Sequence, residues 1–306
     1  MTVLAFDTSN YTTSVAAFDG AEGHNISRLL DVAPGSLGLR QSDALFSHVK
    51  RLPELTDRLF SDISAAKIEA VGVSTRPRAV EGSYMPCFLA GHSQARVLGA
   101  ALGVPVYEFS HQQGHIAASL WSSDHMELMN RPHLAWHLSG GTTELLYVTP
   151  EGVNVHAEKI GGTTDISAGQ LIDRTGQLLG LPFPAGKELD MLSREAADDA
   201  FFRVKVHGTD FSLSGVQNKV EAYYDGRPAE TAAYALRSLI GAIVTATKNA
   251  LQTYPDCTVV FAGGVASNTM LREACADLPA IFCPPQYATD NALGTAVLTW
   301  RAHHAK

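Results

Sequence analysis

The chain has 306 residues, of which 45% are hydrophobic and 18% charged, and its formal net charge is −8. These values are typical of a compact globular protein with one large core or two of ordinary size, and they exclude a disordered chain. The acidic balance argues against a protein that grips nucleic acid by itself, because that affinity comes largely from basic residues and counterion release. If nucleic acid is a substrate, we expect a partner protein to help hold it.

Along the chain, the first predicted elements form a pattern that occurs twice. Residues 4–20 (LAFDTSNYTTSVAAFDG) align without gaps with the start of residues 134–152 (LAWHLSGGTTELLYVTPEG). Both segments have an apolar run, a small polar turn and a second β-rich run, which predicts a hairpin. A third strand is expected after each hairpin, in SRLLDVA from Ser27 and in VNVHAEKI from Val153.

Helical patterns then alternate with short apolar strands in both halves, which predicts parallel pairing with helices on the sheet faces. This order is typical of the duplicated α/β plan of actin, hexokinase and Hsp70, in which a ligand binds in a cleft between two lobes. We expect one lobe over 1–125 plus 292–306 and the other over 126–291, although short hairpins also match by chance. The predicted helices lie near 42–60, 87–102, 166–179 and 228–251 and begin at 268 and 291, and the predicted strands are 69–75, 104–109, 258–264 and 280–285.

A candidate metal site begins with the segment His111-Gln112-Gln113-Gly114-His115. On a helix, residues four apart lie on one face, so both imidazoles can bind one ion. Asp290 is the candidate third ligand, a hard carboxylate from elsewhere in the chain. The alternatives are two ordinary histidines and an aspartate that caps a helix. No glutamate lies between the histidines, which disfavours metalloprotease chemistry.

Glycine-rich turns are the second group of candidate sites. The turn Ser139-Gly140-Gly141-Thr142-Thr143 offers backbone N–H groups and hydroxyls to an oxygen-rich ligand, and Gly161-Gly162-Thr163-Thr164 could do the same before a helix. The alternative is that both are simply tight turns.

Four further residues sit where they could contact a nucleotide. Gly263 and Gly264 follow a buried strand and let a base or ribose approach the backbone, and Asn268 could hydrogen-bond it. The alternative is a strand-to-helix connection capped by Ser267. Asp173 interrupts a partly apolar helix and either accepts bonds from a ligand hydroxyl or pairs with a neighbouring arginine.

Targeting signals are lacking in the sequence. No stretch approaches the roughly 20 apolar residues of a membrane span, and the start MTVLAFDTSN does not look like a signal peptide. The four cysteines have no C-x-x-C spacing, so we expect reduced, half-buried thiols in a cytoplasmic protein without a membrane association.

As an ordered set, these motifs resemble the TsaD family, the tRNA threonylcarbamoyladenosine synthases once labelled glycoprotease-like. The resemblance runs nearly end to end. It rests on the DTS start, His48 in SHVKRLPEL, LGVPVYEFSHQQGHIAA, SGGTTEL, the segment from Asp165 to Gly186, FSLSG, AGGVASN and ATDNA.

The resemblance implies a two-lobed actin-like fold with iron or zinc on His111, His115 and Asp290. It implies that Ser139–Thr143, Asp173, Gly186 and Asn268 contact a threonylcarbamoyl-adenylate, whose acyl group moves to the N6 amine of the adenosine beside the tRNA anticodon. The implied partners are a catalytically silent paralogue of the same fold (TsaB-like) and a small ATPase (TsaE-like).

The sequence also departs from the family pattern. An acidic pair is replaced within Asn10-Tyr11-Thr12, a glutamate by Gln113, a histidine by Thr142, and a glycine-rich turn by RPRAVEGSYMPCFLAG. Two other functions therefore stay open: an ATP-dependent phosphotransferase or hydrolase on the same scaffold, and a non-catalytic module that binds metal and nucleotide. Asp7 as the only acid near the turn of the first hairpin disfavours the former, and the intact histidine pair disfavours the latter. A peptidase ranks last.

Overall fold

The computed structural model describes residues 1–9, 11–31, 39–63, 68–287 and 289–305, so the departure at Asn10 lies outside the described residues. The chain divides into two compact units. The first comprises Met1–Arg131, Thr149–Ala157 and Asp290–Lys306, and the second comprises Pro132–Val148 and Glu158–Thr289.

The first unit is built on a five-stranded sheet with the order β3-β2-β1-β4-β5. β1 pairs antiparallel with β2 and parallel with β4, and β4 pairs parallel with β5. Its elements are β1 (Thr2–Ser9), β2 (Thr12–Phe18), β3 (Gly23–Leu29), α1 (Gln41–Asp62), β4 (Ile68–Arg76), α2 (Phe88–Leu102), β5 (Val106–Ser110), α3 (His111–Ser122), η1 (Met126–Asn130) and α9 (Leu293–His304).

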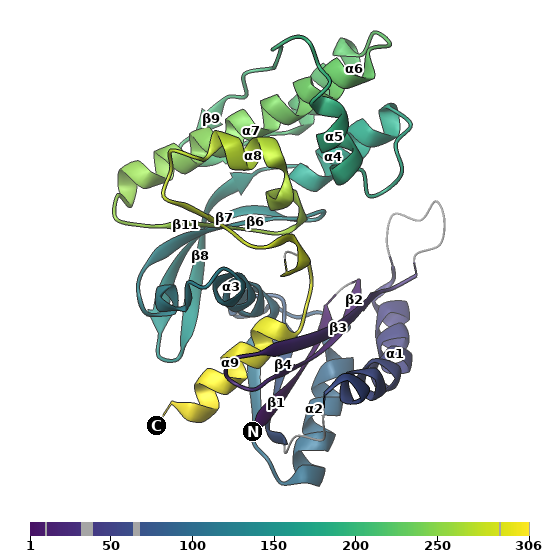
Figure 1. Cartoon of the computed structure of the whole chain (residues 1–306), viewed down its shortest axis with the longest axis vertical. Coiled ribbons are helices and arrows are strands. Elements are labelled where there is room, and N and C mark those ends of the chain that lie inside the picture. The colour runs from purple at the N-terminus through teal and green to yellow at the C-terminus, as the bar shows by residue number, and fades with distance from the viewer. Residues whose placement is uncertain (10, 32–38, 64–67, 288, 306) are drawn as a thin grey trace. The chain divides into compact units, whose positions relative to one another are not determined.

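Helices cover both faces of this sheet, which explains why the strands β1 and β2 are buried along their whole length. Figure 1 shows α1 and α2 on one side of the strands and α9 on the other. Leu4 and Phe6 of β1 pack with Leu52 of α1 in one core cluster. On the opposite face a Cβ at Gly72 would lie 1.8 Å from the Thr299 hydroxyl of α9, so glycine lets that helix approach β4 closely.

A close helix pair positions the segment that carries the two histidines. A Cβ on Gly294 of α9 would lie 1.8 Å from the carbonyl oxygen of Gly114 in α3, which leaves no room for any other residue there. This contact places the first turns of α3 beside the start of α9, where Asp290 lies.

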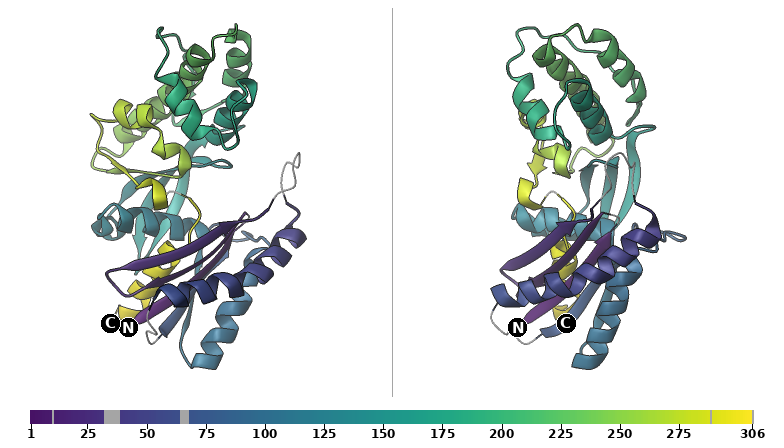
Figure 2. Two further views of the ribbon diagram at one scale, coloured as in Figure 1. Left: turned by 45° about the vertical axis from the view of Figure 1, so that its right-hand side comes forward. Right: turned by 90° about the vertical axis from the view of Figure 1, so that its right-hand side faces the viewer.

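The second unit is built on a seven-stranded sheet with the order β12-β11-β6-β7-β8-β10-β9. In Figures 1 and 2 its longest helix, α7, runs among the other helices of this unit. The elements are β6 (His133–Leu138), β7 (Thr143–Glu151), β8 (Asn154–Thr163), α4 (Ala168–Leu178), α5 (Gly186–Ser193), β9 (Val206–His207), β10 (Asp210–Phe211), α6 (Ser214–Tyr223), α7 (Pro228–Thr253), β11 (Val259–Ala262), η2 (Gly264–Ser267), α8 (Thr269–Ala274), β12 (Ala280–Phe282) and η3 (Pro285–Tyr287).

The two sheets confirm the internal duplication expected from the sequence. The order β8-β7-β6-β11-β12 repeats β3-β2-β1-β4-β5, with the leading hairpin antiparallel and the later strands parallel in both. The expected third strand of the first half is misplaced: it begins at Gly23, directly after a turn in which Asp19 accepts the amides of Ala21 and Glu22. The predicted strand from Ser27 is only its end.

Two smaller predictions concern the cysteines and membrane-spanning segments. The four cysteines form no disulfide bond, and they are buried rather than half-buried. In the part of the chain that the structure describes, no helix is long and apolar enough to span a bilayer.

His48 of α1 is a polar residue inside the core of the first unit. Its side chain is fully buried, and its Nδ1 lies 2.8 Å from the Thr13 hydroxyl of β2. Burial lowers the pKa of His48 to about 4. The unfolded chain therefore binds a proton at His48 at a higher pH than the folded protein does, so stability is lost as the pH falls.

We predict that the free energy of unfolding contributed by His48 falls by at most about 3 kcal/mol between pH 6.5 and pH 4. Urea unfolding at a series of pH values measures this against His48→Gln, which keeps a hydrogen-bonding group near Thr13 and does not titrate. The wild type should lose stability relative to the variant over that interval. If the free energies of unfolding of the wild type and His48→Gln differ by the same amount at every pH, the lowered pKa of His48 is contradicted.

Candidate metal centre and ligand turns

The sequence of α3 places both histidines on one face of its first turns. Ser110 caps the helix by accepting the Gln113 amide, and the Gln113 side chain returns a bond to the Ser110 amide, so α3 begins at His111. Residues four apart then project from the same face. Asp290 lies just before α9, whose N-cap is Ala292, so the alternative of a helix-capping Asp290 is wrong.

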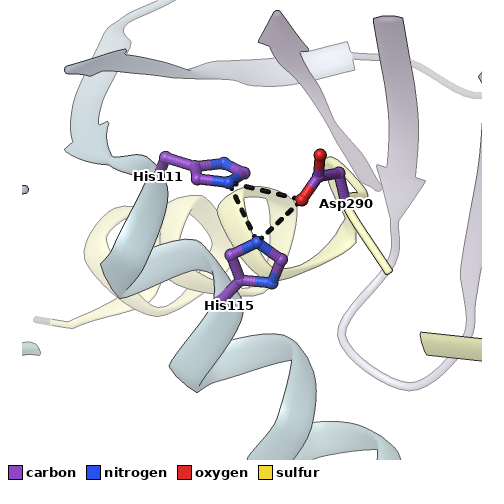
Figure 3. A group of neighbouring side chains, drawn as sticks. All are labelled: His111, His115 and Asp290. Carbon is purple, nitrogen blue, oxygen red and sulfur yellow. Dashed lines mark hydrogen bonds and ion pairs between the residues drawn. The ribbon is translucent and has the colours of Figure 1, made fainter. Parts of the chain in front are cut away.

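The three predicted metal ligands converge within the first unit (Figure 3). The Nε2 atom of His115 lies 2.9 Å from Nε2 of His111 and 3.1 Å from Oδ1 of Asp290, and the remaining distance is 3.5 Å. Within the described ranges this is the one group of three such ligand atoms close enough to share an ion.

These distances fit a divalent metal ion. Metal–nitrogen and metal–oxygen bonds of about 2.0–2.2 Å at tetrahedral angles separate neighbouring ligands by roughly 3.3–3.6 Å, a little more than most of the distances between the three atoms. Two imidazoles and one carboxylate suit zinc or iron and leave coordination positions for an exogenous ligand. The two histidines thus share one neighbouring carboxylate, and the binding of a metal ion to them stays a prediction.

Asp7 orients the first ligand from the sheet. Its Oδ2 lies 2.8 Å from Nδ1 of His111 and accepts the Ser74 hydroxyl at 2.7 Å, and its Oδ1 accepts the Ser9 amide at 2.9 Å. A carboxylate behind a histidine ligand fixes the ring and raises its basicity. Thr12 supports the third ligand by donating to Oδ2 of Asp290 at 3.3 Å. The sequence offered one signal for this role, an aspartate that directly follows the apolar run VLAF of β1.

The charges of the site are strongly coupled. Burial would lower the pKa of His111, but the carboxylates of Asp7 and Asp290 outweigh it and raise that pKa to about 10. Burial would raise the pKa of each carboxyl group, but its bonds and attraction to the histidines hold both pKa values below their usual range. In the metal-free protein, His111 thus carries a proton that a metal ion can displace when it binds.

The replacement of a glutamate by Gln113 has a structural explanation. Besides capping α3, the Gln113 side-chain NH₂ donates to the carbonyl oxygen of Val155 at 2.8 Å. A carboxylate could accept the Ser110 bonds but could not donate to that carbonyl. Gln113 therefore ties α3 to the segment Thr149–Ala157 and forms no part of the ligand triad.

In the second unit, the turn Ser139–Thr143 packs on the start of α4. The Ser167 hydroxyl donates to the Gly140 carbonyl at 2.6 Å, and the Ala168 amide donates to the Thr143 hydroxyl at 2.7 Å. A Cβ at either Gly140 or Gly141 would meet no atom within 4 Å, so both backbones are open on that side. Thr142 closes the turn through its backbone, which bonds Ser139 in both directions and makes few demands on its side chain.

Asp173 and Gly186 are neighbours in this unit. Asp173 accepts the amide of Ala185, the residue before Gly186 at the start of α5, at 2.9 Å. Burial raises the pKa of Asp173. The neighbouring Arg174 donates instead to Gln217, so the alternative of a local ion pair with Asp173 is wrong.

Asn268 and Gly263 complete this set. Asn268, not Ser267, caps α8: its side-chain oxygen accepts the Leu271 amide, and its NH₂ donates to Asp190 of α5. Gly263 has φ +94°, and a Cβ there would lie 2.2 Å from the Leu138 carbonyl, immediately before Ser139.

The contacts of the second unit thus run in a closed ring. The turn after β6 contacts α4, α4 contacts α5, α5 contacts α8, and the turn before α8 returns to the end of β6. The predicted ligand residues Ser139–Thr143, Asp173, Gly186, Gly263, Gly264 and Asn268 all lie on this ring, whereas their ligand contacts stay predictions.

One candidate turn does not join the ring. Gly161 and Gly162 belong to β8, where Cβ atoms would clash with Thr209 and with the Thr143 backbone, and the Gly162 amide already bonds Thr209. The prediction that this segment cradles a ligand is therefore wrong, because its glycines serve close packing between strands.

Asp165 has a role that the sequence did not reveal. It accepts the hydroxyls of Ser212 and Ser214 and the amide of Leu213, and these bonds outweigh burial and lower its pKa well below the usual range. Hydrogen bonds thus join the segment around Asp165 to the segment FSLSG, which gives both motifs a structural role.

Comparison with known proteins agrees with these features. The family model described as TsaD, tRNA N6-adenosine threonylcarbamoyltransferase, matches residues 38–297, which include the histidine pair, the glycine turns and Asp290. The chain belongs to the TsaD family. It is thereby a member of a family of transferases, and the resemblance seen in its motifs is confirmed.

Curated relatives of this TsaD-family chain carry the same description. A tRNA N6-adenosine threonylcarbamoyltransferase of Carboxydothermus hydrogenoformans is 33% identical over 258 residues, covering 80% of this chain and 74% of the relative. One of Streptococcus pneumoniae is 31% identical over 314 residues, covering 95% and 89%.

Solved structures confirm the expected actin/hexokinase/Hsp70-like fold of this TsaD-family member. T. kodakarensis HypF superposes with a TM-score of 0.61 at 13% identity over 99% of this chain, which spans about half (48%) of that HypF chain. A ROK family protein from Streptococcus pneumoniae superposes with a TM-score of 0.55 at 12% identity over 100% of this chain and 99% of its own. At such identity these likenesses show the fold alone.

We predict that metal binding releases close to one proton per ion at pH 8, because His111, with a pKa of about 10, is protonated in the metal-free protein and must lose its proton to bind. Affinity should rise with pH up to about that value. Calorimetric titration with Zn²⁺ in two buffers of different ionisation enthalpy measures the release. A value near zero would contradict the description of the site.

Proposed function

We propose that this protein transfers the threonylcarbamoyl group from threonylcarbamoyl-adenylate to N6 of the adenosine next to the anticodon in tRNA. The observation that carries the proposal is the TsaD family match over 38–297, together with the relatives of the same description at 31–33% identity. In this reaction the amine nitrogen bonds to the carbamoyl carbon, the bond from that carbon to the phosphate oxygen breaks, and AMP leaves.

The residues of the first unit suit this chemistry. His111, His115 and Asp290 would hold one iron or zinc ion, which when bound would polarise an oxygen of the acyl donor. Because the donor is already activated, the protein requires no covalent nucleophile. Asp7 holds the ring of His111, and Thr12 holds Asp290.

The residues of the second unit are proposed to bind the adenylate. The open backbones of Gly140 and Gly141 suit phosphate or carbonyl oxygens, and half-buried Asp173 suits a ribose hydroxyl. Asn268 is proposed to face the nucleoside although its side chain also caps α8. Gly186 and the Gly263–Gly264 turn would allow the ligand close approach to the backbone.

We also propose that partners assist, because the chain has a net charge of −8 and no basic tract to hold tRNA. The partners would be a TsaB-like paralogue and a TsaE-like small ATPase, in the cytoplasm where tRNA is modified. Support comes from apolar side chains exposed on the neighbouring helices α1 and α2, among them Phe46 and Val97, each 65% exposed. Such side chains are typical of a protein interface.

An ATP-dependent phosphotransferase is the less favoured function. Its Mg²⁺ would need an acid near the turn of the first hairpin. Asp7, the one available there among the described residues, is only 1% exposed and is already bonded to His111, Ser74 and Ser9.

We predict that the purified protein forms threonylcarbamoyladenosine when it is combined with its two partners, a source of the adenylate and tRNA, and that His111→Ala lowers the rate at least about a hundredfold. Mass spectrometry of nucleosides from the digested tRNA measures the product. His125→Ala is the matched control, since His125 is exposed and pairs with Glu127.

Absence of product from the wild-type protein with every partner present would contradict the proposed function. Full activity of His111→Ala would instead contradict only the role of the metal triad.

A further inference from the structure

Ser9, the last residue of β1, carries a buried hydroxyl without a partner. Its side chain is 3% exposed, and its Oγ forms no hydrogen bond with any part of the chain that the structure describes. Its backbone amide is satisfied by Asp7. Buried hydroxyls are nearly always hydrogen-bonded, so an orphaned one indicates either strain or a ligand that supplies the missing partner.

The position of Ser9 favours a ligand. Side chains two apart on a strand lie on the same face, so Ser9 shares a face of the sheet with Asp7, which bonds His111. Across the ladder Ser9 pairs with Thr12, whose hydroxyl bonds Asp290. The free hydroxyl thus lies beside the two residues that hold the first and third members of the metal-ligand triad.

Two further buried atoms of the first unit that lack a hydrogen-bond partner, in His48 and Thr295, do not lie beside the metal-ligand triad. The orphaned Nε2 of His48 belongs to a residue that bonds Thr13, on the opposite face of the sheet from Asp7. The orphaned hydroxyl of Thr295 is fully buried in α9, 3.0 Å from where a Cβ on Gly114 would lie, at a packed contact between two helices. Ser9 is the one next to the residues that support the triad.

We propose that Ser9 is a substrate-binding residue whose hydroxyl donates a hydrogen bond to an oxygen of the acyl group at the triad. The chemical class recognised is an N-carbamoyl amino acid, which offers carboxylate and carbamoyl oxygens. This inference rests on the proposed function, which supplies the acyl group. Thr12, placed opposite Ser9, remains engaged with Asp290 and leaves the Ser9 hydroxyl as the available donor.

The ligand-free protein offers a readout that does not depend on activity. Ser9→Ala removes a buried hydroxyl that has no partner, so it should leave the thermal unfolding midpoint unchanged or raise it. Thr295→Val, which removes the other orphaned hydroxyl without changing the shape of the side chain, should behave in the same way. The two variants are therefore matched in their structural effect and differ only in their relation to the triad.

The test titrates N-carbamoyl-L-threonine, a stable mimic of the acyl group, into the Zn²⁺-loaded full-length protein by calorimetry. We expect Ser9→Ala to bind the probe about tenfold more weakly than the wild type, the effect of losing one hydrogen bond to a charged oxygen. We expect Thr295→Val to bind it as the wild type does. The affinity of both variants for Zn²⁺ should be unchanged.

The outcomes separate this inference from the proposed function. Equal probe affinity of Ser9→Ala and the wild type, no probe binding by the wild type, or loss of Zn²⁺ by Ser9→Ala would each overturn the role of Ser9. If Ser9→Ala binds the probe more weakly but the wild-type protein fails to modify tRNA with all partners present, the role of Ser9 is supported. Only the assignment of tRNA as the acceptor is then overturned.

Discussion

The hydrogen bond between Asp7 and His111 is the interaction on which the metal centre depends. It joins the central strand of the first sheet to the first residue of α3, with the carboxylate 1% exposed and the two atoms 2.8 Å apart. A buried carboxylate is costly unless it is paired and hydrogen-bonded, and here a histidine, a hydroxyl and a backbone amide satisfy it. The same bond fixes the ring of His111 so that its other nitrogen faces His115 and Asp290.

Glycines set the remaining geometry of both units by allowing backbones to touch. Gly294 against Gly114 brings Asp290 to the histidines, and Gly263 against Leu138 brings the turn before α8 to the turn after β6. Three residues at which the sequence departs from the family pattern have local partners in the structure. Gln113 caps α3 and bonds Val155, Thr12 bonds Asp290, and Thr142 closes its turn through the backbone. These three changes are therefore accommodated locally, and the three ligand side chains stay close together.

The sequence predicted the fold well because hydrophobic periodicity and strand order are local signals. Both hairpins and the βα units after them could be predicted in this way. Helical spacing predicted the pairing of His111 with His115, and Asp290 was named as third ligand from the chemistry of such sites and from the family resemblance. It failed where a residue's role depends on a distant neighbour. Asp7 stood out as an acid after an apolar run, but its partner His111 could not be read from the sequence. Gly161 and Gly162 looked like a ligand turn although they pack against Thr209 and Thr143. The hydrogen bonds of Asp165 were missed for the same reason, whereas the cap of α8 was misplaced by one residue.

The most direct test of the central claim is the Zn²⁺ affinity of Asp7→Asn, measured by competition with a chelator of known affinity. The variant keeps the size of the side chain but removes the charge that holds His111, so affinity should fall about 10- to 100-fold. Glu54→Gln, which alters an exposed acid paired with Arg28, should bind Zn²⁺ as the wild type does. An Asp7→Asn protein that is folded and binds Zn²⁺ within twofold of the wild type would contradict the account.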